Sequence, residues 1–262
     1  MLRHRILSAL VGIPLIVVAV WHGSLPLFIL TGLLMILASM EIVAIFQRIR
    51  LYLPLWLSLG SSLLLLILTY IYRDAVWGVA AVPLLFLILL TMVLQYPGFT
   101  PVEGAVTLLS TFYVGLFVFL YLLRLLPDGW IWLIFTLVGT WSSDTLAYFI
   151  GRRWGRHQLA PVLSPGKTVE GALGGIAGSL GAAAVFSLIY PFIPRGPLLF
   201  LGLLLGVAAL LGDLVESAFK RQAGVKDAGD IIPGHGGILD RFDSMLFTAP
   251  LVYYYVGRFI IS

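Results

Sequence analysis

Residues 6–40 read ILSALVGIPLIVVAVWHGSLPLFILTGLLMILASM and contain no Asp, Glu, Lys or Arg. A helix crosses the hydrocarbon core of a bilayer in about 20 residues, so this stretch is long enough for two crossings. The segment from Trp21 to Pro26 interrupts it with a glycine, a serine and a proline, which favour a turn. The stretch therefore predicts two membrane-spanning helices joined by a tight turn.

The composition of the whole chain agrees with this stretch. Of the 262 residues, 60% are hydrophobic and 11% are charged, whereas soluble domains have roughly 45–50% and about 25%. The mean hydropathy is +1.05, and so short a chain cannot bury that much apolar surface in a water-soluble core. The composition excludes a cytosolic enzyme and a disordered protein. The absence of cysteine excludes disulfides, a thiolate metal site and a cysteine nucleophile.

Uncharged stretches continue along the chain and predict an all-α, polytopic integral membrane protein. The nine predicted spans lie near residues 6–21, 25–46, 51–72, 75–96, 104–126, 130–151, 171–193, 197–212 and 242–261. Nine spans place the two termini on opposite sides of the membrane. Twelve of the 16 Lys and Arg residues then fall on the N-terminal side. Because cytoplasmic loops carry the excess of Lys and Arg, we expect a cytoplasmic N-terminus and an external C-terminus.

Polar residues are concentrated in the second half of the chain. Residues 1–140 contain only four of the 12 acidic residues, and all three lysines lie beyond them. We therefore divide the chain into N-terminal transmembrane helices, residues 1–130, and a catalytic transmembrane region, residues 131–262, with a polar cytoplasmic site. The first part is expected to act as a scaffold, and contacts of a homodimer are compatible with it.

The densest polar stretch covers residues 212–243, GDLVESAFKRQAGVKDAGDIIPGHGGILDRFD. On a continuing helix Asp213, Ser217 and Lys220 share a face, and Asp240 and Asp243 share another. Carboxylates at a membrane border are costly unless they are paired, hydrated or bound to a cation. The three aspartates, 213, 240 and 243, offer the hard oxygen ligands that suit Mg²⁺. Ion pairing of these aspartates with nearby arginines is the alternative interpretation.

A glycine-rich turn, Pro233-Gly-His-Gly-Gly237, lies between these carboxylates. Glycines permit close backbone approach, so the N–H groups of Gly236 and Gly237 are candidate phosphate contacts. His235 is a candidate general base, metal ligand or support of the turn. Positive charge suited to phosphates comes from Lys220, Arg221, Lys226 and Arg241. Carboxylates that could bind a metal, a glycine-rich turn and basic side chains that could bind phosphate together predict a phosphoryl or nucleotidyl transfer site.

A second polar stretch covers residues 141–171. It places Asp144 inside a predicted span, where a functional role is the default and pairing with a nearby arginine is the alternative. The segment SPGKTVEG begins at Ser164, and its proline and glycine predict that a helix starts near Lys167 or Thr168. Free N–H groups at such a start attract anions. We interpret Glu216 as a surface or supporting group.

Residues 217–243 carry a resemblance to a known family. The pattern resembles, without a departure, the signature of the phosphatidate cytidylyltransferases, or CDP-diacylglycerol synthases. It consists of Ser217, Phe219-Lys220-Arg221, Lys226-Asp227, Gly229, Ile232-Pro233, His235-Gly236-Gly237-Ile238 and Asp240-Arg241-Phe242-Asp243. The resemblance implies that CTP and phosphatidic acid react to give CDP-diacylglycerol and pyrophosphate with Mg²⁺.

The resemblance also implies roles for individual residues. The catalytic candidates are Asp213, Lys220, Asp240 and Asp243, of which the three aspartates would bind the metal. The substrate-binding candidates are Asp144, Ser164, Lys167, Thr168, Ser217, Arg221, Lys226, His235, Gly236, Gly237 and Arg241. A second, monovalent or divalent, cation beside Mg²⁺ stays an option.

The expected partners are CTP, phosphatidic acid and the lipid bilayer. A net charge of +4 is too small to predict a nucleic-acid partner, and a homodimer is left open. We expect the protein in the inner membrane of a prokaryote, with its site facing the cytoplasm. Two alternatives stay open: transfer to another lipid phosphate, such as an isoprenoid ether lipid, and an ion or solute transporter. A transporter would spread its charges through the bilayer midplane, often in paired half-repeats.

Overall fold

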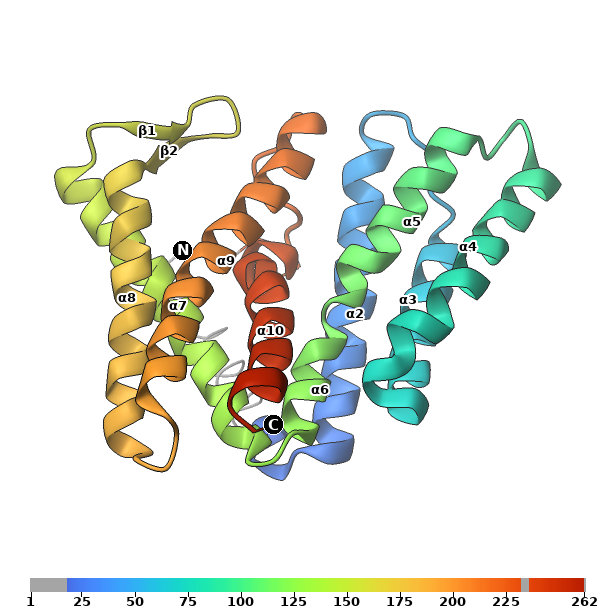
Figure 1. The fold of residues 1–262 in the computed structure, drawn as a ribbon. Helices are drawn as coiled ribbons and strands as arrows, with labels where there is room; N and C mark the ends of the chain where they lie inside the picture. Colours follow the sequence, from blue (N-terminus) through green and yellow to red (C-terminus); the bar gives the residue numbers. More distant parts are fainter. Residues whose placement is uncertain (1–17, 232–235, 262) are drawn as a thin grey trace. The chain divides into compact units, whose positions relative to one another are not determined.

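The computed structural model describes residues 18–231 and 236–261, and its elements are labelled in Figure 1. The elements are α2 (Ser24–Gln47), α3 (Leu55–Tyr72), the 3-10 turn η1 (Arg73–Ala75), α4 (Val76–Gln95), α5 (Pro101–Gly115), α6 (Val118–Leu125), α7 (Gly129–Trp154), β1 (Gln158–Ala160), β2 (Ser164–Thr168), α8 (Val169–Ile189), α9 (Arg195–Gln222) and α10 (Leu239–Phe259). The prediction of an all-α architecture is confirmed, with one short hairpin that the sequence did not predict.

Seven helices among the described residues are long and apolar enough to cross a membrane. They are Leu25–Gln47, Leu55–Tyr72, Val76–Gln95, Pro101–Leu125, Gly129–Trp154, Val169–Ile189 and Arg195–Gln222. They coincide with seven of the predicted spans, so the polytopic membrane architecture is confirmed. Most of the predicted first span, 6–21, lies outside the described residues. The last predicted span is helical as α10, but three consecutive tyrosines and two charged residues lower its hydropathy. The total of nine therefore stays a prediction.

The chain forms two compact units. Unit 1 consists of the residues up to Leu122 together with Phe219–Arg241, and unit 2 consists of Leu123–Ala218 together with Phe242–Ser262. Both α9 and α10 thus contribute residues to each unit. The stretch 219–241, which the sequence placed in the catalytic region, belongs to the same unit as the N-terminal helices.

The core of unit 1 is aliphatic and aromatic. Side chains of α3 and α4 form one cluster around Leu65 and Leu84, and a second cluster joins Leu57, Ile88 and Phe99. At the start of α5, the Glu103 carboxylate accepts hydrogen bonds from the backbone N–H groups of Thr100 and Tyr52, each at 2.7 Å. The bond to Thr100 caps α5, and the bond to Tyr52 ties the segment before α3 to the start of α5.

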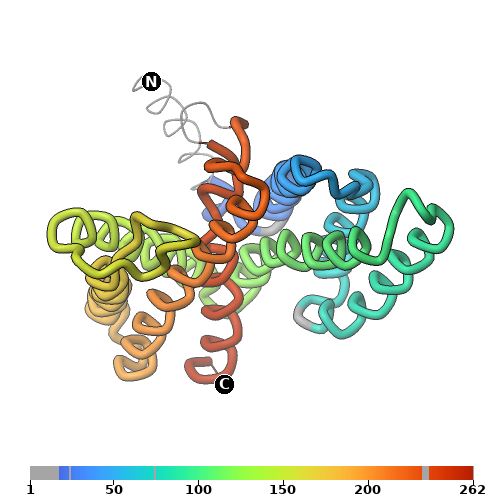
Figure 2. The backbone as a smooth tube through the Cα atoms, turned by 90° about the horizontal axis from the view of Figure 1, so that it is seen from above, coloured from blue at the N-terminus to red at the C-terminus, as the bar shows by residue number. Residues whose placement is uncertain are grey.

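In unit 2, α7 and α8 pack side by side, and the β1–β2 hairpin joins their ends (Figure 2). The strands are antiparallel, with Gln158 paired to Thr168. The Thr168 hydroxyl accepts the Gly171 N–H at 3.0 Å and caps α8, so the predicted helix start near Lys167 or Thr168 is confirmed. Glycines of α8 allow the close approach to α7, because a Cβ at Gly178 would lie 2.5 Å from the Ser142 carbonyl oxygen.

This packing gives a testable prediction for two glycines of the same helix. Gly178→Ala places a methyl group against the α7 backbone and should destabilise the protein by about 1–3 kcal/mol. Gly181→Ala meets no atom within 4 Å and should be neutral or stabilising by about 0.5–1 kcal/mol, because alanine favours the helix. The measurement is the melting temperature of each detergent-purified variant. Equal melting temperatures would contradict the packing described here.

Candidate functional site

Three carboxylates of unit 2 lie close enough together to share a cation. Asp213 and Glu216 stand three residues apart on α9, and Asp243 comes from the first turns of α10. One oxygen from each lies within 4.8 Å of the others. A glycine makes this possible: a Cβ at Gly212 would collide with the Asp243 carbonyl oxygen. The two helix backbones therefore approach one another directly beside the carboxylates.

Glu216 is the member of this group that sequence reasoning missed. Its side chain is buried, with only 1% of the residue exposed, so of the two interpretations, a surface or a supporting group, the surface one was wrong. Position alone could have identified it, because a spacing of three residues puts it on the same helical face as Asp213. A buried carboxylate is costly without compensating charge or hydrogen bonds.

A lysine and two serines contact the same region of unit 2. Lys167, at the end of the hairpin, places its Nζ 2.7 Å from the Asp213 carboxylate. The Ser217 hydroxyl is oriented to donate to Asp213 at 3.4 Å. Ser244 donates its backbone N–H to Asp243 at 2.7 Å and its hydroxyl to Asp144 at 3.3 Å. The structure thus brings together Asp144, Lys167, Asp213, Ser217 and Asp243, five of the sequence candidates.

The donor set suits a hard divalent cation. Mg²⁺ binds oxygen ligands at about 2.0–2.1 Å, so two oxygens on one ion lie at most about 4.2 Å apart. Small side-chain rotations would bring oxygens that lie within 4.8 Å of one another to that separation. The residues present therefore fit Mg²⁺, with Glu216 added to the predicted ligands.

Asp240, the third predicted metal ligand, lies in a different arrangement in unit 1. Its carboxylate accepts a hydrogen bond from the Lys220 ammonium at 2.7 Å. The backbone N–H groups of Ala228 and Gly237 donate to its other oxygen, both at 2.8 Å. Burial opposes ionisation, but these bonds hold the pKa of the Asp240 carboxyl below its usual range. In this structure Asp240 binds the backbone at Ala228 and at Gly237, and the carboxylate cluster among the described residues is formed without it.

The remaining candidates occupy several places. Thr168 uses its hydroxyl as the cap of α8, and Ser164 begins β2. Gly236 has a positive φ of 82°, and the N–H of Gly237 binds Asp240. His235 lies outside the described residues. Three basic side chains are exposed: Arg221, Lys226 and Arg241.

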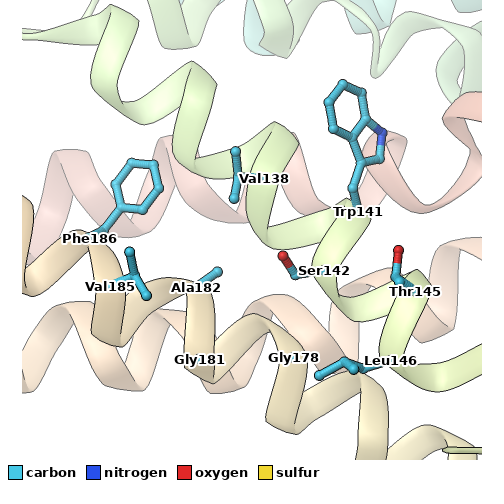
Figure 3. A pocket seen from close by; sticks show the side chains of 10 residues that line it. All are labelled: Val138, Trp141, Ser142, Thr145, Leu146, Gly178, Gly181, Ala182, Val185 and Phe186. Atoms are coloured by element: carbon cyan, nitrogen blue, oxygen red, sulfur yellow. The ribbon is translucent and has the colours of Figure 1, made fainter. Parts of the chain in front are cut away.

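A pocket between α7 and α8 differs chemically from the carboxylate cluster. It has a volume of about 620 Å³ and is lined by Val138, Trp141, Ser142, Thr145, Leu146, Gly178, Gly181, Ala182, Val185 and Phe186 (Figure 3). No charged side chain lines it, so it lacks the charge compensation that a triphosphate or a metal ion requires. The carboxylate cluster is therefore the stronger candidate for the chemistry.

Comparison with known proteins identifies the family of the chain. The model of the cytidylyltransferase family matches residues 3–259. A protein of Staphylococcus saprophyticus named phosphatidate cytidylyltransferase is 36% identical over 257 residues, covering 96% of this chain and 97% of the relative. A protein of Bacillus subtilis with the same name is 36% identical over 271 residues, covering 98% of both chains. The match extends over nearly the whole sequence, and the chain belongs to the cytidylyltransferase family.

Proposed function

We propose that this membrane protein transfers the cytidylyl group of CTP to phosphatidic acid, giving CDP-diacylglycerol and pyrophosphate. The observation that carries this proposal is the near full-length similarity to relatives named phosphatidate cytidylyltransferase. The carboxylate cluster and its lysine support it, because a nucleotidyl transfer needs charge compensation at a triphosphate. The product is a precursor for phospholipid synthesis.

The reaction itself requires little acid–base chemistry from the protein. An oxygen of the phosphatidic acid phosphate forms a bond to the α-phosphorus of CTP, and the bond from that phosphorus to the bridging α–β oxygen breaks. Pyrophosphate leaves with the electron pair. A phosphate monoester is already ionised near neutral pH, its second pKa being about 6, so no strong general base is needed. The protein mainly has to position two anions and compensate their charge.

Asp213, Glu216 and Asp243 would hold Mg²⁺, and Asp144 lies within hydrogen-bond distance of their neighbour Ser244. When bound there, the cation would supply positive charge to the phosphate oxygens. Lys167 neutralises a non-bridging phosphate oxygen after exchanging its contact with Asp213 for one with the nucleotide. Ser217 and the capped start of α8 at Thr168 donate hydrogen bonds to phosphate.

Basic residues of the signature stretch are proposed to supply further positive charge. Lys220, Arg221, Lys226 and Arg241 are proposed to contact phosphate groups, as the family signature implies. Lys220 is held in place by Asp240, which restricts its rotamers before a substrate arrives. In this assignment Asp240 orients a lysine, and metal binding is proposed for the carboxylates of unit 2.

The proposed location is the inner membrane of a bacterium, which agrees with the bacterial sources of the relatives. We place the N-terminus and the site on the cytoplasmic side, since CTP is a cytoplasmic solute and most basic residues fall on that side. With a ninth span the C-terminus would be external.

The proposed reaction predicts a specific substrate requirement. Purified protein in mixed micelles should release pyrophosphate from CTP only when phosphatidic acid and Mg²⁺ are both present, with one CDP-diacylglycerol formed per pyrophosphate. An isoprenoid ether lipid phosphate serves as the competing acceptor. Absence of phosphatidate-dependent pyrophosphate release, or a strong preference for the ether lipid, would overturn the assigned reaction.

The carboxylate cluster predicts the effect of three charge-removing substitutions. Asp213→Asn, Glu216→Gln and Asp243→Asn should each lower kcat/KM about 100-fold or more, because each removes an anionic oxygen from the proposed cation site. Asp128→Asn is the matched control: the residue is exposed with a φ of 50°, which asparagine tolerates. Normal turnover by folded Glu216→Gln protein would refute its role beside the two aspartates.

A further inference from the structure

Glu41 connects two parts of unit 1 that are far apart in the sequence. It belongs to α2, and only 3% of its surface is exposed. Its carboxylate accepts the backbone N–H groups of Ile238 at 2.8 Å and Leu239 at 2.9 Å. These two residues lead into α10, whose first turn carries Asp240 and Arg241. The Glu41 side chain is thus directed into the protein and not toward solvent.

The Glu41 carboxylate caps the start of α10, as an N-cap side chain would, although it belongs to another helix, α2. The first N–H groups of a helix have no partners within it and carry a partial positive charge. A carboxylate that accepts two of them forms strong, charge-assisted hydrogen bonds. Burying the Glu41 carboxylate is otherwise costly, so the two bonds stabilise one conformation of this helix start and disfavour others.

The Glu41 carboxylate fits against the backbone because Gly229 and Gly237 have no side chains. A Cβ at Gly237 would lie 2.6 Å from the carboxylate carbon and from both carboxylate oxygens of Glu41. A Cβ at Gly229 would lie 3.0 Å from one of these oxygens. The glycines of this segment therefore have a role besides phosphate contact: they admit a buried anion against the backbone.

The N–H groups at the helix start are divided between two carboxylates. Gly237 donates to Asp240, which also holds Lys220, whereas Ile238 and Leu239 donate to Glu41. Displacing the Glu41 carboxylate would free two of these three neighbouring N–H groups. The segment would then lose the geometry in which Asp240 receives the Gly237 N–H and the Lys220 ammonium together.

We propose that Glu41 is a positioning residue for the reaction, because it fixes residues 237–241 and through them the Lys220–Asp240 pair. This role rests on the proposed function and on the assignment of Lys220 to phosphate contact. Glu41 acts through the backbone of the segment and contacts no substrate. Neutralising it should therefore slow turnover in protein that remains folded.

The chain offers a matched control in Glu103. This carboxylate is also buried in unit 1 and also accepts two backbone N–H groups, those of the α5 N-cap Thr100 and of Tyr52, but no candidate site residue takes part in its bonds. Glu41→Gln and Glu103→Gln should lower the melting temperature by similar amounts. Only Glu41→Gln should lower kcat, by about 10-fold or more, and only Glu41→Gln should speed hydrogen–deuterium exchange in peptides covering residues 236–241.

The outcomes separate the two proposals. Equal specific activities of the folded Glu41→Gln and Glu103→Gln proteins, or unchanged exchange at 236–241, would overturn the positioning role. If the unsubstituted protein shows no phosphatidate-dependent activity, the proposed function fails, and the exchange measurement alone decides whether Glu41 orders the segment.

A double-variant experiment tests the contact between Gly237 and the Glu41 carboxylate. Gly237→Ala should lower kcat because its methyl group collides with the Glu41 carboxylate. Glu41→Asp shortens the side chain by one methylene group and withdraws the carboxylate, so the Gly237→Ala/Glu41→Asp protein should be several-fold more active than Gly237→Ala alone. A double variant whose loss equals the product of the two single losses would show that the residues act independently and contradict the contact.

Discussion

The structure depends on how the negative charge of each carboxylate beside the membrane-spanning helices is compensated. Only 12 acidic residues occur in the chain, and an ion at a membrane border needs an opposite charge, hydrogen bonds or a bound cation. Glu41 binds two backbone N–H groups at the start of α10, and Glu103 binds those of Thr100 and Tyr52. Asp240 binds a lysine and two N–H groups. Asp213, Glu216 and Asp243 differ because three carboxylates meet in one place, where a divalent cation would relieve their mutual repulsion.

Glycines at close backbone contacts allow these charged groups to lie near one another. Close helix contact at Gly212 brings Asp243 beside Asp213, and Gly237 makes room for the Glu41 carboxylate. A larger residue at either position would separate groups that must lie within a few ångströms of one another. The same property that allows tight packing of membrane helices therefore shapes the polar centre, and packing and chemistry in this chain share one physical basis.

The sequence predicted what is encoded locally. Seven of the predicted spans coincide with helices, although α9 continues to Gln222, beyond the predicted end at 212. The proline and glycine before Lys167 located the start of α8. Asp213 and Asp243 were identified because their spacing and polarity stand out against apolar helices. Glu216 was interpreted as a surface or supporting group and not as a metal ligand, although it shares the face of Asp213. Glu41 could not be found, since its partners lie 197 and 198 residues away and no local pattern marks such a pair.

The central claim is that Asp213, Glu216 and Asp243 together hold one divalent cation. Electron paramagnetic resonance of Mn²⁺ titrated into detergent-purified protein tests it without any turnover. A shared cation site should give a saturable bound-Mn²⁺ signal, competed by Mg²⁺, that is weakened at least tenfold in Glu216→Gln and unchanged in Asp128→Asn. Equal Mn²⁺ affinity in the unsubstituted protein and in Glu216→Gln would contradict it.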